Sequence, residues 1–205
     1  MPFFTSIENC LENLDISVIS LSRKRTLDQL KDYIQSKVNI QQDINLNFIC
    51  THNSRRSHLG QVWAQTLASY YKIEKFSAFS GGTEATALFP KVAETLKSQG
   101  FIIEVIEESE NPLYAISFDE NKDSVLCFSK MYNDFDNPVN DFAAIMTCDS
   151  ADEACPLISG ADQRFAITYI DPKKSDGTPQ QDEVYRLKSL EIATEMKYVF
   201  SQVIS

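Results

Sequence analysis

Hydrophobic positions along the chain change their spacing near residue 45. In the segment before it, apolar side chains recur at intervals of three and four, which is typical of one face of a helix. The clearest set is Leu27, Leu30, Ile34 and Val38. From residue 45 onward, short continuous apolar runs alternate with helical patterns. We therefore predict a helical extension over residues 1–44, which packs on the rest of the chain or dimerises, and an α/β domain over residues 45–205.

Four apolar runs in the second part predict buried parallel strands, because strands covered on both faces are apolar throughout. They span residues 45–50, 75–79, 142–147 and 165–170. Helices are predicted between them. One covers residues 57–71, and another begins at Pro90, which is tolerated in a first turn, and stops at Gly100.

The last helix has Thr178 as its predicted N-cap, Pro179 in its first turn and Gln181 completing a capping box. Before it, residues 101–134 break the alternation, because the runs FIIEVI, LYAISF and SVLCFSKM are separated only by short turn segments. The predicted fold is therefore a four-stranded parallel sheet flanked by helices on both faces. A β-rich insertion over about residues 101–134 and the N-terminal extension are added to it.

Composition limits the classes of function. The formal net charge of -10 at pH 7 repels polyanions, so neither nucleic acid nor an acidic membrane surface is expected as a partner. No apolar run approaches the roughly 20 residues that span a bilayer. Since the N-terminal residues also lack the basic start of a secretion signal, a cytoplasmic location is expected. Five cysteines do not suit a disulfide framework in that compartment, and no metal ion or cofactor is expected.

The segment CTHNSRRS, which runs from Cys50 to Ser57, carries the candidate chemistry because it joins a predicted strand to a predicted helix. A tight loop there turns backbone N–H groups inward, and the following helix adds the positive end of its dipole. Both features favour a tetrahedral oxyanion and a Cys50 thiolate. Arg56 can hold two oxyanion oxygens, Ser57 can donate to the thiolate and Asn53 can support the loop. The alternative is a buried Cys50 at a strand end, with Arg56 as a solvated charge.

The segment FICTHNSRRS resembles the catalytic loop of the low-molecular-weight protein tyrosine phosphatases and of the thioredoxin-coupled arsenate reductases that share their fold. The resemblance extends from about residue 45 to the C-terminus. It implies Cys50 as nucleophile, Arg56 as oxyanion clamp, and Asn53 and Ser57 as supports of the loop. The other residues expected to line or support the oxyanion site are Thr51, His52, Ser54 and Arg55.

Two loop positions depart from the pattern of the family that the segment resembles. The family usually has glycine where His52 stands, which bears on the backbone of the loop. It often has a second cysteine where Arg55 stands, so a protective or regulatory thiol is absent here. One reading of the first departure is a binding or regulatory module, in which His52 has disabled the loop for catalysis.

A general acid is needed to protonate the leaving oxygen, and it has to reach the same pocket from later in the chain. Asp171, followed by Pro172, comes after the fourth predicted strand, at the end of a parallel sheet where sites lie. The segment TYIDPKKSDGT resembles the acid loop of the family, which implies Asp171 as the acid. An Asp-Pro pair alone is usually only a turn. Lys173 and Lys174 stand where the tyrosine phosphatases commonly have aromatic residues, which weakens the case for an aromatic phosphoester.

Two further cysteines favour the reductase branch of this family. Cys148 and Cys155 follow the third predicted strand at the spacing of the redox cysteines of the arsenate reductases. The resemblance implies a relay that starts at Cys50, continues at Cys148 and ends at Cys155, with a thioredoxin-like reductant. Residues seven apart in a helix lie about 10.5 Å apart along its axis, whereas a disulfide needs Cα atoms within about 4.4 to 6.8 Å. The segment between the two cysteines is therefore looped or unwinds, unless both are ordinary core residues.

Three functions follow from these patterns. The first is an arsenate reductase-like enzyme with a cysteine relay and Asp171 as the acid. The second is a phosphatase that hydrolyses phosphate monoesters through a phosphocysteine at Cys50. The third is the oxyanion-binding module without catalysis. Cys10 and Cys127 lie outside every motif and are expected to be structural.

Overall fold

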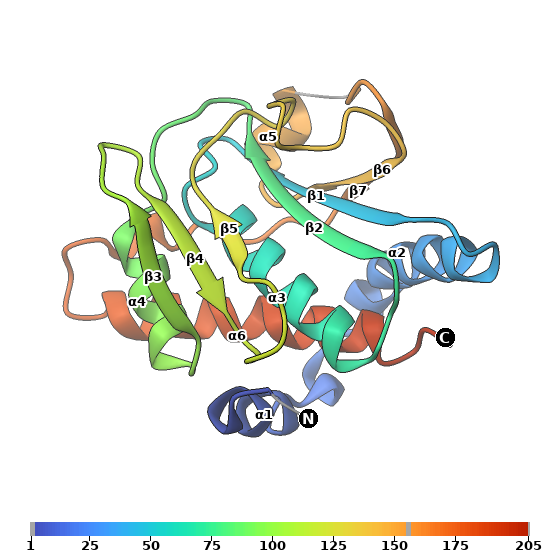
Figure 1. Ribbon diagram of the computed structural model, residues 1–205, viewed down its shortest axis with the longest axis horizontal. Helices are drawn as coiled ribbons and strands as arrows, with labels where there is room; N and C mark the ends of the chain where they lie inside the picture. Colours follow the sequence, from blue (N-terminus) through green and yellow to red (C-terminus); the bar gives the residue numbers. More distant parts are fainter. Residues whose placement is uncertain (1–2, 155–156, 205) are drawn as a thin grey trace.

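A four-stranded parallel sheet forms the centre of the protein. The computed structural model describes residues 3–154 and 157–204. The sheet has the order β2-β1-β6-β7, and each pair of neighbouring strands is parallel (Figure 1). Its strands are β1 (Ile44–Cys50), β2 (Phe76–Gly82), β6 (Phe142–Met146) and β7 (Ala161–Ala166). The predicted α/β fold with a four-stranded parallel sheet is confirmed.

The connections of β1 and β6 open a crevice at the carboxyl end of the sheet. The chain passes from β1 to β2 on one side, and it returns to the other side of β1 only at β6. Connections that leave two adjacent parallel strands in opposite directions splay apart, and open α/β sheets bind their ligands there. Cys50 is the last residue of β1 and Cys148 comes just after β6. Both cysteines therefore lie at this crevice.

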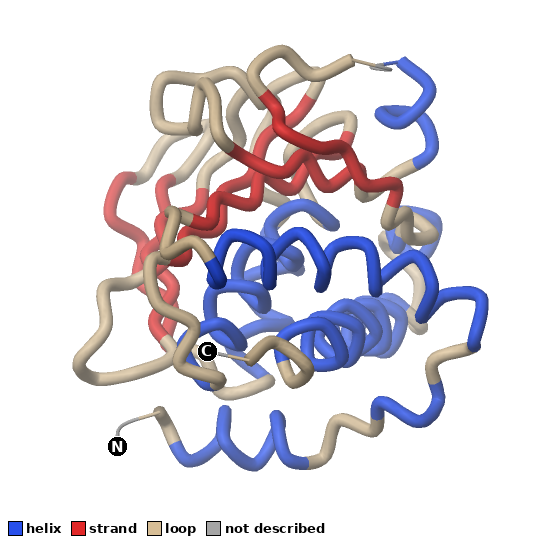
Figure 2. The backbone as a smooth tube through the Cα atoms, turned by 90° about the vertical axis from the view of Figure 1, so that its right-hand side faces the viewer, coloured by secondary structure: helices blue, strands red, loops and turns tan. Residues whose placement is uncertain are grey.

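Helices cover one face of the sheet in two layers (Figure 2). The first layer consists of α2 (Leu21–Asn39) and α3 (Arg56–Tyr70), which contact the strands directly. The second contains α6 (Gln181–Phe200), which packs on both of them and on α4 (Pro90–Ser98). Trp63 of α3 is fully buried, and its Nε1 donates a 2.8 Å hydrogen bond to Ser189 of α6. A buried aromatic ring with its polar atom satisfied fixes α3, and with it the loop that leads into α3.

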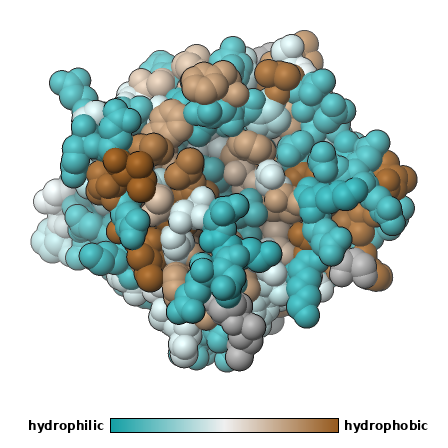
Figure 3. Space-filling model, viewed as in Figure 1, coloured by the Kyte–Doolittle hydropathy of each residue, from teal (hydrophilic) through white to brown (hydrophobic). Residues whose placement is uncertain are grey.

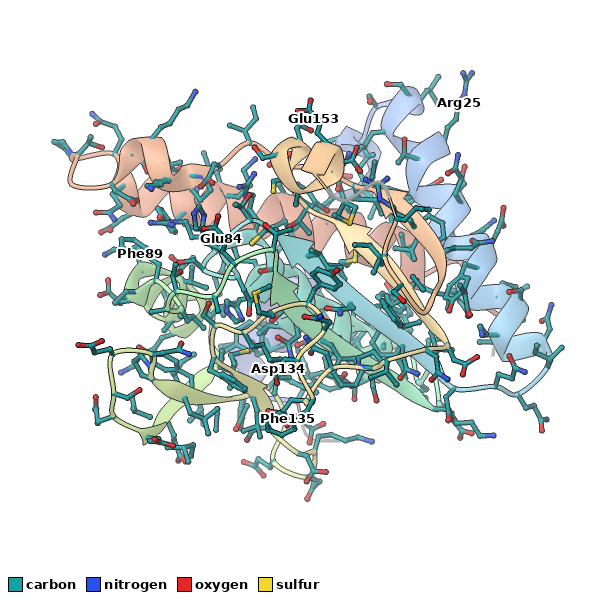
Figure 4. All side chains as sticks on the ribbon, turned by 90° about the horizontal axis from the view of Figure 1, so that it is seen from above. Arg25, Glu84, Phe89, Asp134, Phe135 and Glu153 are labelled. Carbon is teal, nitrogen blue, oxygen red and sulfur yellow. The ribbon has the colours of Figure 1, made fainter. Side chains whose placement is uncertain are left out.

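The other face of the sheet carries the short helix α5 (Asp149–Ala154) and the irregular segment between β5 and β6. Figure 4 looks down on this side and labels Asp134 and Phe135 of that segment. Tyr132 ties the segment to the sheet, because its N–H donates to the Gly82 carbonyl at 2.9 Å. Apolar residues beneath form a second, smaller cluster. Its members include Ile49, Phe142, Ala144, Met146, Cys148, Ala151 and Ile158.

The N-terminal residues form α1 (Thr5–Glu12), a 3₁₀ turn at Ile16–Val18 and α2. The predicted apolar stripe of α2 lies in the same core as β1, with Leu27, Leu30 and Ile34 fully buried. Arg23 adds a two-pronged ion pair with Glu195 of α6, at 2.6 and 2.8 Å. The division of the chain into an extension over residues 1–44 and a domain over residues 45–205 stays a prediction.

A small antiparallel sheet interrupts the parallel fold, as the sequence predicted. It has the order β3-β4-β5, with β3 (Ile102–Glu107), β4 (Leu113–Ser117) and β5 (Val125–Cys127). On β3, Ile102, Val105 and Ile106 are each about half exposed. They contribute to the hydrophobic surface visible on the face shown in Figure 3.

The fourth predicted strand was placed too late in the chain. The prediction covered residues 165–170, whereas β7 spans Ala161–Ala166. Its first half is polar because β7 is an edge strand, whose outer side faces solvent and tolerates charged residues. After Ala166 the chain stays extended, and Ile167 and Tyr169 donate backbone hydrogen bonds to Met146 and Thr147. An apolar run thus continues past the strand, toward the loop that holds Asp171.

The start predicted for the last helix was also wrong. α6 begins at Gln181, after Gln180 as N-cap, and Thr178 makes no capping box. The Thr178 hydroxyl instead donates to the Ser175 carbonyl at 2.7 Å, and Gln181 Oε1 accepts from the Gly177 N–H at 3.3 Å. The preceding 3₁₀ turn, Pro172–Ser175, takes Thr178 as a partner, so the helix begins later.

Candidate active site

The loop between β1 and α3 holds the predicted nucleophile. Cys50 ends β1 with 4% of its surface exposed, and α3 begins at Arg56. The first N–H groups of a helix have no partner inside it, so this end of α3 favours an anion. Asn53, in the middle of the loop, has a φ of 44°. Asparagine is one of the few residues that adopt this left-handed conformation readily. The predicted order of strand, loop and helix is confirmed.

A chain of hydrogen bonds presents a donor to the Cys50 sulfur. Ser57 Oγ lies 3.1 Å from Cys50 Sγ and accepts a 2.9 Å hydrogen bond from Asn53 Nδ2. The Ser57 oxygen receives the amide hydrogen and still has its own hydrogen to give, so it donates to the sulfur when Cys50 is a thiolate, which has no hydrogen of its own. The arrangement suits a Cys50 thiolate, which accepts a strong hydrogen bond. Ser57 and Asn53 thus lie where the resemblance implied that supports of the loop should be.

Asn53 is itself fixed from two sides. Its Oδ1 accepts from the Lys130 N–H at 2.8 Å, and its carbonyl oxygen lies 2.8 Å from His58 Nε2. A carbonyl only accepts, so His58 Nε2 carries a hydrogen. Burial lowers the pKa of His58 to about 3, so the ring is neutral and its Nδ1, 3.2 Å from Ser80 Oγ, carries no proton. The neutral imidazole therefore acts as a fixed donor to the left-handed turn.

Segments from elsewhere in the chain hold the outer side of the loop. The carbonyl of Thr51 accepts from the Glu84 N–H at 2.8 Å, and that of His52 accepts from Ser129 Oγ at 2.9 Å. The His52 side chain is half exposed, with Nε2 3.4 Å from the Glu84 carboxylate; Figure 4 shows Glu84 beyond the ends of the strands. A Cβ on Gly82 would lie 2.2 Å from the Glu84 carbonyl oxygen and 2.7 Å from Asn53 N. Only glycine permits this close approach.

Arg56 and Asp171, the predicted clamp and acid, form an ion pair. Arg56 Nη2 donates to Asp171 Oδ2 at 2.6 Å, and its Nη1 donates to the Tyr169 carbonyl at 2.8 Å. Arg56 Nε is buried and has no partner among the described residues. Asp171 Oδ1 accepts from the Lys173 N–H at 2.9 Å, which fixes the carboxylate at the start of the 3₁₀ turn. Two residues far apart in sequence are thereby brought together at one pocket.

Cys148 lies on the opposite side of the crevice, at the start of α5. It is 2% exposed, its Sγ is 3.4 Å from Thr51 Oγ1, and it accepts from the Ala151 N–H at 3.4 Å. Thr51 thus joins the catalytic loop to the second predicted cysteine of the relay. The third, Cys155, lies outside the described residues. Cys127 is also buried, and burial raises the pKa of its thiol to about 12, which keeps it unreactive.

Within the described residues, no group of three His, Cys, Asp or Glu side chains is placed to hold a metal ion. Over the same ranges, no helix is long and apolar enough to cross a membrane.

The sequence has distant relatives among curated proteins, although no family model matches it. It is 25% identical to an arsenate reductase of Bacillus subtilis over 134 residues, which is 65% of this chain and 78% of the relative. It is 26% identical to arsenate reductase 2 of Staphylococcus epidermidis over 125 residues, or 61% of this chain and 76% of the relative.

Solved structures share the fold. A low-molecular-weight protein tyrosine phosphatase from T. tengcongensis superimposes with a TM-score of 0.53 at 16% identity, covering 78% of this chain and 99% of that one. A mutant of YwlE from Bacillus subtilis gives 0.53 at 13% identity, covering 78% and 98%. An arsenate reductase in its oxidized state gives 0.50 at 16% identity, with the same coverage. The chain thus has the fold of the low-molecular-weight protein tyrosine phosphatases.

The surroundings of Arg55 differ from those that the sequence predicted for an oxyanion ligand. Its Nε donates to Tyr185 Oη at 2.7 Å and its Nη2 donates to Asp176 at 2.8 Å. The guanidinium also lies over the Phe89 ring, 4.2 Å from its centroid. Its donors are therefore engaged with α6 and the acid loop. The partners Asp176, Tyr185 and Phe89 are far away in sequence, and no local pattern indicates them.

Three further residues of the site were missed by sequence reasoning. His58 and Lys130 support Asn53, and Gly82 makes room for the loop. His58 follows directly after Ser57, so its position was a usable signal, but its target is a backbone atom that no sequence pattern marks. The glycine pair that ends β2 was seen only as the end of a strand.

Proposed function

We propose that the protein is an arsenate reductase-like enzyme, with Cys50 as nucleophile, Arg56 as oxyanion clamp and Asp171 as acid. The observation that carries the proposal is the buried Arg56 Nε, which has no partner among the described residues. A buried donor without an acceptor costs about 1–3 kcal/mol. An oxyanion oxygen beside the guanidinium would accept from Nε and from Nη2 together, which is the two-pronged geometry that arginine favours. The curated relatives named arsenate reductase support the same reaction.

In the first step of the proposed reaction, an arsenate oxygen takes the place of Asp171 at the Arg56 guanidinium. The Cys50 thiolate then attacks arsenic, and a hydroxyl group leaves as water with the proton of Asp171. Ser57 and the N–H groups of the loop stabilise the sulfur and the arsenate oxygens. The product is a Cys50 arsenate thioester, in which arsenic is still pentavalent.

In the second step, the Cys148 thiolate attacks Cys50 Sγ. A Cys50–Cys148 disulfide forms, the electron pair of the sulfur–arsenic bond stays on arsenic, and arsenite leaves. The contact of Cys148 with Thr51 supports this assignment, because it places the second sulfur beside the loop of the first. Cys155 then attacks Cys148 and frees Cys50, and a thioredoxin-like dithiol reduces the Cys148–Cys155 disulfide. Each turnover thus uses two electrons from the dithiol.

Hydrolysis of phosphate monoesters is the second candidate, because a low-molecular-weight protein tyrosine phosphatase has the same fold. It would use Cys50, Arg56 and Asp171 alone: the thiolate takes the phosphoryl group, Asp171 protonates the leaving alcohol, and water then cleaves the phosphocysteine. No step of this reaction uses Cys148. The proposed site binds the oxyanion without a metal ion or cofactor.

The test compares both activities in one preparation with a thioredoxin-like reductant. Cys148→Ser and Cys155→Ser are expected to abolish arsenate reduction, and Cys50→Ser to abolish both reactions by about 10⁴-fold or more. Cys10→Ser serves as the control, since Cys10 lies away from the site and is expected to change neither activity. If the unmodified protein hydrolyses an aryl phosphate but reduces no arsenate, the phosphatase assignment replaces the reductase.

The non-enzymatic alternative has its own outcome in this test. It predicts that neither reaction proceeds and that Cys50→Ser still binds arsenate as tightly as the unmodified protein. Isothermal titration of arsenate into both proteins measures that affinity. Turnover of either substrate would exclude this alternative.

A further inference from the structure

A cleft of about 1200 Å³ lies between the edges of the two sheets, away from Cys50. One wall is the outer edge of β2, and the other is formed by β5 and the residues after it, which lie next to β2 in Figure 1. Gln61 of α3 joins the walls, because its Nε2 donates to the carbonyls of Ala78 at 3.2 Å and Leu126 at 3.3 Å. These two hydrogen bonds fix the distance between the two walls of the cleft. Its volume is slightly above the range of about 300–1,000 Å³ that is typical of small-molecule sites.

Lys130 is the unusual residue among those that line the cleft. It is only 5% exposed, and no described residue accepts a hydrogen bond from its Nζ or forms an ion pair with it. The ammonium lies 4.3 Å from the centroid of the Phe128 ring. Burial lowers the pKa of Lys130, and electrostatic interactions with Cys127, Asp136 and Asp134 act against that change. A buried ammonium without an anionic partner is costly, so an anion in the cleft would gain by pairing with it.

The rest of the lining limits what kind of anion fits. Apolar side chains supply part of the lining of the cleft, namely Phe76, Ala78, Phe79, Phe118, Val125 and Phe128. Five carboxylates also line it and repel a ligand with several negative charges; they belong to Glu8, Glu74, Asp119, Asp123 and Asp136. A bound peptide cannot add as a further strand along the middle of β2, because the Ala78 N–H that it would need already donates to Gln65 Oε1 at 2.9 Å.

We propose that this cleft is a second binding site, which takes a small ligand with one carboxylate and an apolar body. The carboxylate pairs with Lys130 Nζ, and the apolar body packs on Phe128 and the β2 edge. The inference does not depend on the reaction at Cys50.

The position of Lys130 connects the cleft to the catalytic loop. Its N–H donates to Asn53 Oδ1 at 2.8 Å, and its carbonyl accepts from the Gly82 N–H at 2.9 Å. A ligand that shifts the Lys130 side chain can therefore also shift the Lys130 backbone, which is hydrogen-bonded to Asn53. Occupancy of the cleft is expected to change the affinity of the Cys50 loop for arsenate, and arsenate to change the affinity of the cleft by the same factor.

The probe for the test is phenylbutyrate, compared with its uncharged amide, in titrations of the full chain followed by calorimetry and by amide chemical shifts. We expect saturable binding, with shifts in β2 and β5, and about tenfold weaker binding of the amide. Lys130→Met, which keeps the apolar stem, is expected to weaken phenylbutyrate by a similar factor. Lys122→Gln, at another lysine of the same cleft, is the matched control and should bind as the unmodified protein does.

Three outcomes would overturn the proposal. One is no saturable binding of phenylbutyrate at millimolar concentration, and another is equal affinity for the acid and the amide. The third is an equal loss of affinity in Lys130→Met and Lys122→Gln, which would indicate general attraction to positive charge. The comparison of acid with amide uses only the unmodified protein, so it decides the question even where Lys130→Met fails to fold.

Discussion

The two sides of the crevice that contain Cys50 and Cys148 are held in different ways. On the side of β1, the loop is fixed by hydrogen bonds from α3, from the segment after β2 and from the segment after β5. On the side of β6, Cys148 leads into α5, a helix of 6 residues, and its sulfur has two contacts at 3.4 Å. The first arrangement suits an oxyanion pocket that must keep its shape. The second suits a cysteine that has to change partners during a reaction.

The largest expected effect comes from adding a methyl group on the β1 side of the crevice, which we call the rigid side because several segments hold its loop by hydrogen bonds. In Gly82→Ala, the new Cβ lies 2.2 Å from the Glu84 carbonyl oxygen, so the loop has to shift. We expect a loss of about 3 kcal/mol in the free energy of unfolding and weaker arsenate binding. Urea unfolding and titration calorimetry measure the two effects. Gly177→Ala is the control for a glycine without close neighbours, since nothing lies within 4 Å of its added Cβ. The left-handed φ of 72° at Gly177, which Gly82 does not share, is expected to cost about 1 kcal/mol there.

A smaller effect is expected when the donor to the left-handed turn is removed. His58→Leu leaves the buried Asn53 carbonyl without its 2.8 Å partner, which costs about 2 kcal/mol in the free energy of unfolding. His58→Gln can still donate from its amide and should recover most of this loss. Equal stability of the two variants, measured by urea unfolding, would contradict the role given to the His58 N–H.

The same histidine makes the rigid side sensitive to acid. Burial lowers its pKa in the folded protein to about 3, against 6.5 for an imidazole in water, so on acidification the unfolded chain takes up a proton that the folded protein does not. The stabilisation is complete above pH 6.5 and is lost as the pH falls from there toward 3. The slope reaches about 1.4 kcal/mol per pH unit. Urea unfolding between pH 6.5 and 4 should show a shallower slope in His58→Gln, and an unchanged slope would refute this assignment.

The smallest effect is expected on the side of Cys148. Asp152 of α5 pairs with Arg164 of β7, and both side chains are about a quarter exposed. Asp152→Asn should change the free energy of unfolding by less than about 1 kcal/mol, while hydrogen exchange at the α5 amides becomes faster. A loss of global stability as large as that of Gly82→Ala would show that the two sides of the crevice are equally rigid, and the contrast would fail.

The sequence predicted those parts of the site that depend on local order. Cys50, Asn53, Arg56 and Ser57 lie within one strand, loop and helix, so their spacing in the chain largely sets their spacing in space. The resemblance to a known loop added Asp171, which follows the edge strand β7 and reaches Arg56 at the same end of the sheet. The surroundings of Arg55 could not be predicted, because its three partners come from other elements.

The errors in the fold have the same origin. The polar residues at the start of β7 are those of an edge strand, and only the position of the strand in the sheet explains them. The sequence at Thr178 does match a capping box, but the Thr178 hydroxyl donates to the Ser175 carbonyl of the preceding turn and does not cap α6. Local chemistry thus predicted most elements and their order. The first residues of β7 and α6, in contrast, depend on contacts with neighbouring segments, which the local pattern does not show.

The ion pair of Arg56 with Asp171 has a kinetic consequence. In the proposed reaction, an entering oxyanion has to displace a carboxylate at 2.6 Å. Part of its binding energy then goes into separating the pair, and this raises the substrate concentration needed for half-maximal rate. The same exchange separates Asp171 from its cationic partner only when the oxyanion is bound. In the proposed reaction, the acid therefore faces the substrate only in a filled site, and it stays paired with Arg56 in an empty one.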